Sequence, residues 1–268
     1  MADVLDELKI TRDVIKGVCF PNYGKIYFSS NEKLKSIFSN FDLSNKSVLS
    51  VVASGDQPFY FYNSSISEID LFDINKLAIY YYYLRVWTMK YLSLFYPPHD
   101  LNKKYLKDLL NRVVVSSDLE KDAYNYWTNF INCFNYSDIN NLFFMRYYSY
   151  YENDINDFSN VLLGIDNYHP NFYNINLMDD FKIDKKYDVI YTSNIHEYVP
   201  IDKLVVYRDN LHRLLNDNGI IIFTNVREKC VEDYEVFVFN KYFSYYRIPR
   251  EHNHFFSDIP GYYYVKRR

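Results

Sequence analysis

The sequence contains a short β-branched and apolar segment that runs into a loop of small residues, Ser47-Val48-Leu49-Ser50-Val51-Val52-Ala53-Ser54-Gly55-Asp56. Such a segment is typical of a strand buried on both faces of a parallel sheet. A second strand is predicted at Glu68-Ile69-Asp70-Leu71-Phe72-Asp73, and it ends in an acid. A small-residue loop lets a ligand approach the backbone, and an acid after the next strand can accept hydrogen bonds from ribose hydroxyls. The two segments therefore indicate an adenosine-binding βαβ unit.

The spacing of the loop glycine and the acid fits this unit, because 18 residues separate Gly55 from Asp73 and about 20 are expected. The loop has one glycine, whereas a G-x-G-x-x-G loop that holds a dinucleotide pyrophosphate has three. S-adenosylmethionine (SAM) carries no phosphate, so it constrains the loop less. A purely structural alternative is that Gly55 turns the chain and Asp73 caps a helix.

Helical and strand patterns continue along the whole chain. Helical spacing of apolar residues predicts helices at 2–16, 31–41, 75–95, 101–112, 119–134, 139–151 and 203–215. Further strands are predicted at 172–176, 187–191 and 219–224, followed by a closing antiparallel pair within 234–246 and 261–265. Residues 216–219, Asn-Asp-Asn-Gly, are expected to form the turn after the last helix.

Four segments, in this order, resemble the motifs of the Rossmann-like (class I) SAM-dependent methyltransferases. The first strand and loop resemble their first motif, and Asp73 resembles their ribose-binding acid. The segment 176–181, Asn-Leu-Met-Asp-Asp-Phe, is similar to the one whose acid or amide meets the adenine amino group. The segment 187–194 resembles the fourth strand and its catalytic edge, and 214–223 resembles the helix, turn and strand that follow.

This resemblance implies a fold, a cofactor and a set of binding residues. The fold is one α/β domain over 1–268 with a doubly wound, mostly parallel sheet and an antiparallel closing strand, with an N-terminal helical segment at 1–45 and a helical insertion at about 97–158. These additions are expected to cover the carboxyl edge of the sheet and shape the acceptor pocket. The implied cofactor is SAM, and the residues expected to bind it are Ala53, Ser54, Gly55, Asp56, Gln57, Asp73, Ile74, Asn75, Met178, Asp179, Ser193 and Asn194.

A narrower resemblance leaves the reaction open. The loop Ser54-Gly55-Asp56-Gln57, followed by Asp73-Ile74-Asn75 and a long apolar helix, is similar to the betaine-lipid synthases, which transfer the 3-amino-3-carboxypropyl arm of SAM. Methyl transfer to a small molecule is the leading interpretation, and arm transfer is the alternative. A non-catalytic SAM-binding or interaction module is a third possibility from a different class of protein.

Catalytic residues are expected in the loop after the strand 187–191, because ligands of open α/β sheets bind outside the carboxyl ends of strands. His196 is a candidate general base, and Glu197 or Tyr198 could orient it. The structural alternative is that His196 and Glu197 open the next helix and face solvent. Alignment alone can also carry group transfer, without a dedicated base.

Composition and charge exclude several other classes. A net charge of -4 and a pI of about 5.9 disfavour a broad nucleic-acid interface. Cys19, Cys133 and Cys230 have no zinc or disulfide spacing, and His252 and His254 lack companion ligands, so no metal is expected.

The N-terminus lacks signal-peptide character and no apolar run reaches the ~18 residues of a membrane span, so a cytoplasmic location is predicted. Aromatic residues make up 20% of the chain, which reflects either biased composition or a ligand-stacking surface.

Overall fold

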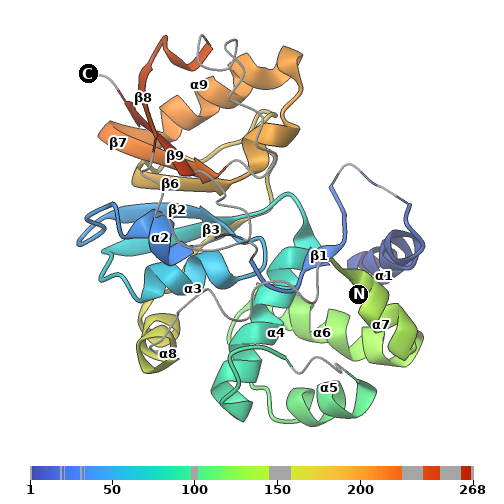
Figure 1. Cartoon of the computed structure of the whole chain (residues 1–268). Helices are drawn as coiled ribbons and strands as arrows, with labels where there is room; N and C mark the ends of the chain where they lie inside the picture. Colours follow the sequence, from blue (N-terminus) through green and yellow to red (C-terminus); the bar gives the residue numbers. More distant parts are fainter. Residues whose placement is uncertain are drawn as a thin grey trace, which may run out of the picture.

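The central element of the chain is a seven-stranded mixed sheet with strand order β5-β3-β2-β6-β7-β9-β8. The computed structural model describes residues 2–18, 20, 22–30, 32, 34–97, 102–144, 158–224, 238–247 and 261–266. Five strands run parallel, and β9 pairs antiparallel with both β7 and β8 (Figure 1). The strands are β2 (Ser47–Val51), β3 (Glu68–Phe72), β5 (Phe172–Tyr173), β6 (Tyr187–Ser193), β7 (Leu215–Thr224), β8 (Phe243–Arg247) and β9 (Gly261–Lys266).

The order of the strands reverses between β2 and β6. Val48 of β2 pairs with Ile69 of β3 on one side and with Val189 of β6 on the other. All five residues of β2 are buried, as expected for the apolar centre of a parallel sheet. The five parallel strands have the order found in doubly wound sheets, and an antiparallel pair completes the edge. The predicted fold class is confirmed.

Helices cover both faces of this sheet. The helices α2 (Leu34–Phe38), α3 (Asp56–Tyr62) and α8 (Phe158–Asn167) lie on one side, and α9 (Leu204–Leu214) lies on the other (Figure 1). Two short 3₁₀ helices, η1 (Ile195–Tyr198) and η2 (Ile201–Lys203), connect β6 to α9. None of the helices in the described part of the chain is long and apolar enough to cross a bilayer.

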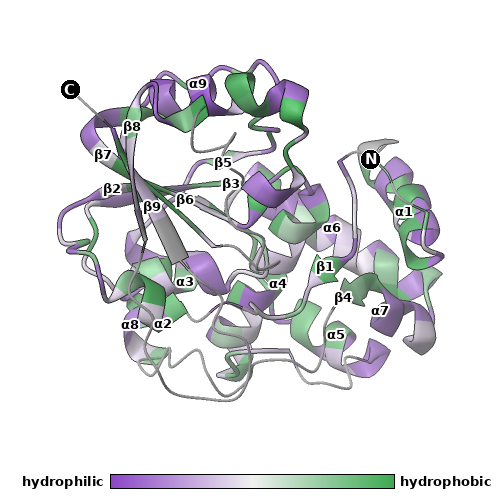
Figure 2. Cartoon of the chain, turned by 45° about the horizontal axis from the view of Figure 1, so that its top comes forward, coloured by the Kyte–Doolittle hydropathy of each residue, from purple (hydrophilic) through white to green (hydrophobic). Residues whose placement is uncertain are grey.

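A second apolar core lies beside the sheet and consists of helices. It is formed by α1 (Ala2–Ile15), α4 (Lys76–Leu92), α5 (Lys103–Leu110), α6 (Asp118–Cys133) and α7 (Tyr136–Leu142). The helix α4 belongs to both cores, because Tyr82 and Met89 pack against the sheet while Tyr80 and Trp87 pack against the helices. Twelve of the 17 residues of α4 are buried, and Figure 2 shows this helix between α3 on one side and α5 and α7 on the other. The division into one domain with two helical additions stays a prediction.

The chain before the first long strand is attached to this helical layer. A two-residue strand, β1 (Ile26–Tyr27), pairs in parallel with β4 (Phe143–Phe144). The predicted helix 139–151 is therefore wrong at 143–144, because Phe143 pairs with Ile26 where the helix was expected to continue. The rest of that predicted helix falls on residues 145–151, which lie outside the described part.

Four further elements differ from the prediction. The helices α3 and α8 have no counterpart among the predicted helices, and in α3 six of the seven residues are buried, so no amphipathic period marks it. The expected turn at 216–219 belongs to β7, whose pairing with β6 shifts register between Leu215 and Ile220. Of the predicted strand at 234–246, residues 234–237 are outside the described part, and the remainder forms β8 only from Phe243.

Candidate functional site

A cavity of about 510 Å³ opens at the carboxyl ends of β2, β3 and β6. This place is where the strand order reverses, and open α/β sheets bind ligands there. Its volume lies within the ~300–1,000 Å³ that small-molecule sites occupy. The described residues that line it are Phe20, Asn22, Tyr23, Gly24, Lys25, Ile26, Tyr27, Val51, Ala53, Phe72, Asp73, Ile74, Asn75, Ala78, Ile175, Asn176, Leu177, Met178, Ser193, Asn194, Ile195 and Tyr198.

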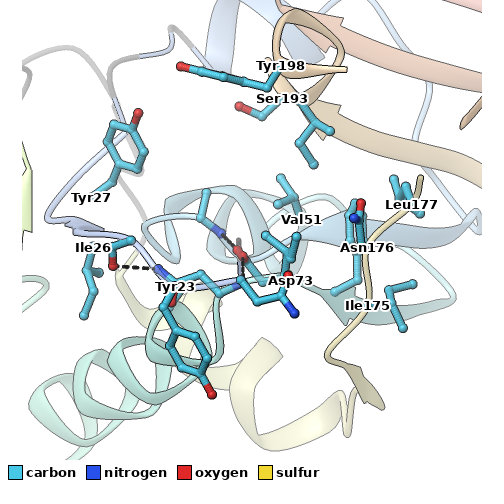
Figure 3. A pocket seen from close by; sticks show the side chains of 18 of the residues that line it. Tyr23, Ile26, Tyr27, Val51, Asp73, Ile175, Asn176, Leu177, Ser193 and Tyr198 are labelled. Carbon is cyan, nitrogen blue, oxygen red and sulfur yellow. Dashed lines mark hydrogen bonds between the residues drawn. The ribbon is translucent and has the colours of Figure 1, made fainter. Parts of the chain in front are cut away.

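Asp73 is the one acid among these lining residues, and it follows β3 directly. Its Oδ2 accepts a hydrogen bond from the Ala53 backbone N–H at 2.9 Å, and its Oδ1 accepts one from the Asn75 N–H at 2.8 Å. These bonds fix the carboxylate between the loop after β2 and the start of α4 (Figure 3). Each carboxylate oxygen can accept more than one hydrogen bond, so the group keeps acceptor capacity for a ligand.

Burial raises the pKa of Asp73 to about 6, although the two backbone hydrogen bonds act in the opposite direction. The carboxyl is therefore ionised at neutral pH and titrates just below it. The ionised form is the acceptor that ribose hydroxyls require. A ligand that donates to it should consequently bind less well as the pH falls through 6.

We expect the affinity for S-adenosylhomocysteine to fall as the pH drops from 7.5 to 5, approaching tenfold per pH unit below 6. Calorimetric titrations at several pH values measure this, with Asp73→Asn as the control that should show a flat profile. A flat profile in the parent protein would mean that Asp73 does not accept from the ligand.

The loop after β2 divides into one residue that lines the cavity and four that do not. Ala53, at a φ of 45°, lines the cavity. Ser54, Asp56 and Gln57 are buried behind it, and Gly55 is also absent from the described lining. Gly55 has a φ of 88°, and a Cβ there would lie 3.3 Å from Phe59 and 3.5 Å from Arg85. The predicted contact between Gly55 and the cofactor stays a prediction, and a side chain there would first disturb Phe59 and Arg85.

Asp56 forms a fully buried ion pair with Arg85 of α4, whose Nη1 donates to Asp56 Oδ1 at 2.7 Å. The same oxygen accepts from the Tyr96 hydroxyl at 2.8 Å. The Arg85 guanidinium also donates to the Ser54 carbonyl and lies 4.2 Å from the centre of the Tyr96 ring. This ion pair and the bond to Ser54 attach the loop after β2 to α4.

Ile74 and Asn75 both line the cavity beside Asp73. The Asn75 Oδ1 accepts from the Leu77 N–H and so caps α4. Its Nδ2 donates to the Gly24 carbonyl at 3.0 Å. The cap therefore also attaches the segment 22–27 to the cavity wall (Figure 3).

In the segment after β5, the cavity lining consists of Ile175, Asn176, Leu177 and Met178. Asp179 is exposed and outside the described lining, where it accepts a hydrogen bond from the Asn176 side chain at 3.0 Å. The Asn176 Oδ1 accepts from the Met178 N–H. The predicted adenine-binding segment is thus at the cavity, with Asn176 and Met178 facing it.

The last residue of β6 and the loop after it supply the opposite wall. Ser193 lines the cavity with a φ of 53°, followed by Asn194 and Tyr198. Figure 3 shows Ser193 and Tyr198 on one side of the space and Asp73 on the other. Tyr27 also borders it, and burial together with Tyr198 raises the pKa of the Tyr27 phenol to about 12.

His196 is buried, and this contradicts the alternative that it faces solvent. Its ring packs edge-on against Phe223 with centroids 4.4 Å apart, and burial lowers its pKa to about 3. Neither ring nitrogen has a hydrogen-bond partner among the described residues, and His196 is not in the described lining. Glu197 is half-buried beside it, also outside that lining. The catalytic roles of His196 and Glu197 stay predictions, and Tyr198 is the candidate that reaches the cavity.

The burial of His196 gives a test by stability. We expect His196→Phe to unfold at the same urea concentration as the parent or higher, because it removes unpaired polar atoms from an apolar site. His196→Ala should lower the free energy of unfolding by about 1–3 kcal/mol through lost packing. A marked loss of stability in His196→Phe would show that the imidazole nitrogens do have partners.

Two parts of the site had no prediction from sequence. The segment Asn22–Tyr27 closes one side of the cavity and includes Lys25, the one cation in the described lining. The second is Glu32, whose carboxylate accepts a hydrogen bond from the Ser193 hydroxyl. The segment 22–27 contains a glycine and two tyrosines but matches no known binding motif. Its sequence therefore does not indicate that it forms part of the cavity wall.

The described residues contain no group of three or more His, Cys, Asp or Glu side chains that could hold a metal ion. His252 and His254 lie outside the described part.

Comparisons with known proteins give similarity in structure only. No family model matches the sequence, and no curated protein sequence matches it. The solved structures that resemble it include the glycopeptide N-methyltransferase MtfA bound to S-adenosylhomocysteine, at 8% identity and a TM-score of 0.47, covering 90% of this chain and 92% of that one. A TehB-like SAM-dependent methyltransferase from Corynebacterium glutamicum has 10% identity, a TM-score of 0.43 and coverages of 100% and 98%. The N-methyltransferase NodS from Bradyrhizobium japonicum has 9% identity, a TM-score of 0.41 and coverages of 88% and 93%. Because the sequence identities and TM-scores are this low, an assignment of function has to depend on the residues of the cavity.

Proposed function

We propose that this chain binds SAM in the cavity at the carboxyl ends of β2, β3 and β6 and transfers a group from it. The observation that carries the proposal is the carboxylate of Asp73, buried and fixed by two backbone N–H groups on the cavity wall. A fixed acceptor at the end of the second strand of a doubly wound sheet suits a ribose diol.

The other walls suit the remaining parts of SAM. Ile74, Leu177 and Met178 contribute apolar surface to the cavity, which fits an adenine ring. Ser193 faces Asp73 from the end of β6, where the reacting end of a ligand held at the ribose would be found, and the next residue, Asn194, also lines the cavity. We assign the cofactor contacts to these residues and to Ala53 and Asn75.

The four loop residues that do not line the cavity have a different role in this proposal. Arg85 donates to the Ser54 carbonyl and the Asp56 carboxylate, and the Ser54 hydroxyl donates to Gln57, so these bonds anchor the backbone next to Ala53. Asp179 holds Asn176 in a similar way. They act on the cofactor through the residues that they position.

We favour methyl transfer to a small-molecule acceptor. The cavity is small, and the phenols of Tyr27 and Tyr198 border it, so a compact acceptor can approach between two aromatic rings. The enzyme chooses which carbon of the sulfonium is attacked by aligning the nucleophile with one bond. Transfer of the aminocarboxypropyl arm uses the same cofactor site and differs in that alignment.

Product analysis by mass spectrometry tests the proposal. Incubation of the protein with SAM and a pool of small-molecule acceptors should yield S-adenosylhomocysteine if a methyl group is transferred. Arm transfer would yield 5′-methylthioadenosine instead. Binding of SAM without either product would identify a non-catalytic binding module, and absence of binding would contradict the proposal as a whole.

A further inference from the structure

Glu32 carries a carboxylate that is 2% exposed and lies directly behind the cavity wall. Its Oε1 accepts from the Ser193 hydroxyl at 2.5 Å and from the Thr224 hydroxyl. Its Oε2 accepts from the Tyr191 hydroxyl at 2.7 Å and from the Gln57 amide at 3.0 Å. Donors thus converge on both oxygens, which is the environment of an ionised, acceptor-only carboxylate.

All these donors are neutral. The described residues provide no cation within ion-pair distance of Glu32, whereas the buried Asp56 and Asp70 pair with Arg85 and Lys185. Hydrogen bonds from neutral groups satisfy a carboxylate without cancelling its charge. A full negative charge therefore remains in the interior at the ends of β6 and β7, where the effective dielectric constant is far below that of water.

This charge is one side chain away from the ligand space. Ser193 donates to Glu32 and also lines the cavity, opposite Asp73 (Figure 3). Lys25 is the one cation among the described lining residues. The wall at Ser193 therefore lies next to a buried negative charge.

We propose that Glu32 sets the charge preference of the cavity and favours a ligand with a positive centre next to Ser193 over its neutral counterpart. This inference rests on the proposed function, in which the positive centre is the sulfonium of SAM and the neutral counterpart is the thioether of S-adenosylhomocysteine. Glu32 acts through space on the ligand's charge, so it is a selectivity residue. At an effective dielectric constant of about 20, a unit charge within several ångströms changes affinity by about tenfold or more.

The test compares two ligands that differ in this charge. Calorimetry gives the dissociation constants of SAM and S-adenosylhomocysteine for the parent protein and for Glu32→Gln, which keeps the shape of the side chain. We expect the affinity for SAM to fall about tenfold and that for S-adenosylhomocysteine to change by less than about twofold. Glu120→Gln is the matched control, because Glu120 is also buried and accepts from the neutral Trp87 and Ser116, but lies in the helical layer. The ratio of the two constants should not change in that variant.

A second variant tests the effect of the Glu32 charge without removing the carboxylate. Gln57→Lys places a cation within reach of Glu32 while the carboxylate stays, and it should raise the dissociation constant of SAM relative to that of S-adenosylhomocysteine. Circular dichroism identifies which variants fold, and the binding constants of either folded variant test whether Glu32 sets the charge preference. An unchanged ratio, or an equal loss of both ligands, would show that Glu32 only supports the structure and would overturn the inference. Failure of the parent protein to bind either ligand would instead overturn the proposed function, and the inference with it.

Discussion

Replacing Asp73 by asparagine is expected to weaken the binding of S-adenosylhomocysteine by about 10²–10⁴-fold. The reason is that a carboxylate accepts two charge-assisted hydrogen bonds from a ribose diol, each worth about 1.5–3 kcal/mol. An amide offers one acceptor oxygen, and its NH₂ group would face the backbone N–H of Ala53 or Asn75, both of which now donate to Asp73. Calorimetric titration of the two proteins measures the loss.

The control for this variant is Asp42→Asn, which removes an exposed carboxylate that is not part of the described cavity lining. It should bind the ligand as the parent does. Urea unfolding of Asp73→Asn separates lost binding from a lost fold, because the variant must remain folded at the temperature of the titration. An affinity within about threefold of the parent would remove Asp73 from the ribose site.

Replacing Arg85 by methionine is expected to lower the free energy of unfolding by about 3–5 kcal/mol. The guanidinium is fully buried and is surrounded by the rings of Phe59, Phe95 and Tyr96 at 4.8, 5.3 and 4.2 Å. Without it, the carboxylate of Asp56 is left buried with no cation. Methionine fills much of the same space, so the loss should come from the unpaired charge. Urea denaturation measures it.

The double variant Asp56→Asn, Arg85→Met isolates the charge effect. It should recover a large part of the lost stability, because no buried charge is left unpaired. Lys185→Met is the matched control, since Lys185 pairs with Asp70 at 2.8 Å but is partly exposed, and its removal should cost less than that of Arg85. If Arg85→Met were as stable as the parent, the ion pair would contribute nothing to holding the loop after β2.

The centre of the sheet could be predicted from sequence because its signals are local. An apolar pattern within the segment itself predicts each of three elements: the buried strand at 47–51, the strand at 68–72 and the helix α9. The elements that were missed have no such pattern. The seven residues of α3 are buried on most sides, and the irregular pairing at Leu215 depends on β6, which is its neighbour in the sheet and not in the chain.

In the candidate site, too, some residues could be predicted from local sequence and others could not. Asp73 follows β3 and Ser193 is the last residue of β6, so both lie at the carboxyl edge, as the sequence pattern predicts. The direction in which Asp56 faces depends on Arg85, which lies 29 residues further along the chain. Glu32 receives its hydrogen bonds from Ser193 and Thr224, which are 161 and 192 residues away. Such contacts arise only when the chain is folded, so the sequence pattern does not reveal them.

The most direct test of the binding site is a crystal structure of the protein grown with S-adenosylhomocysteine. The proposal predicts density for the ligand in the cavity at the ends of β2, β3 and β6, with both ribose hydroxyl oxygens within about 3.2 Å of the Asp73 carboxylate. Density for the ligand elsewhere on the protein, or a ribose that does not contact Asp73, would contradict it.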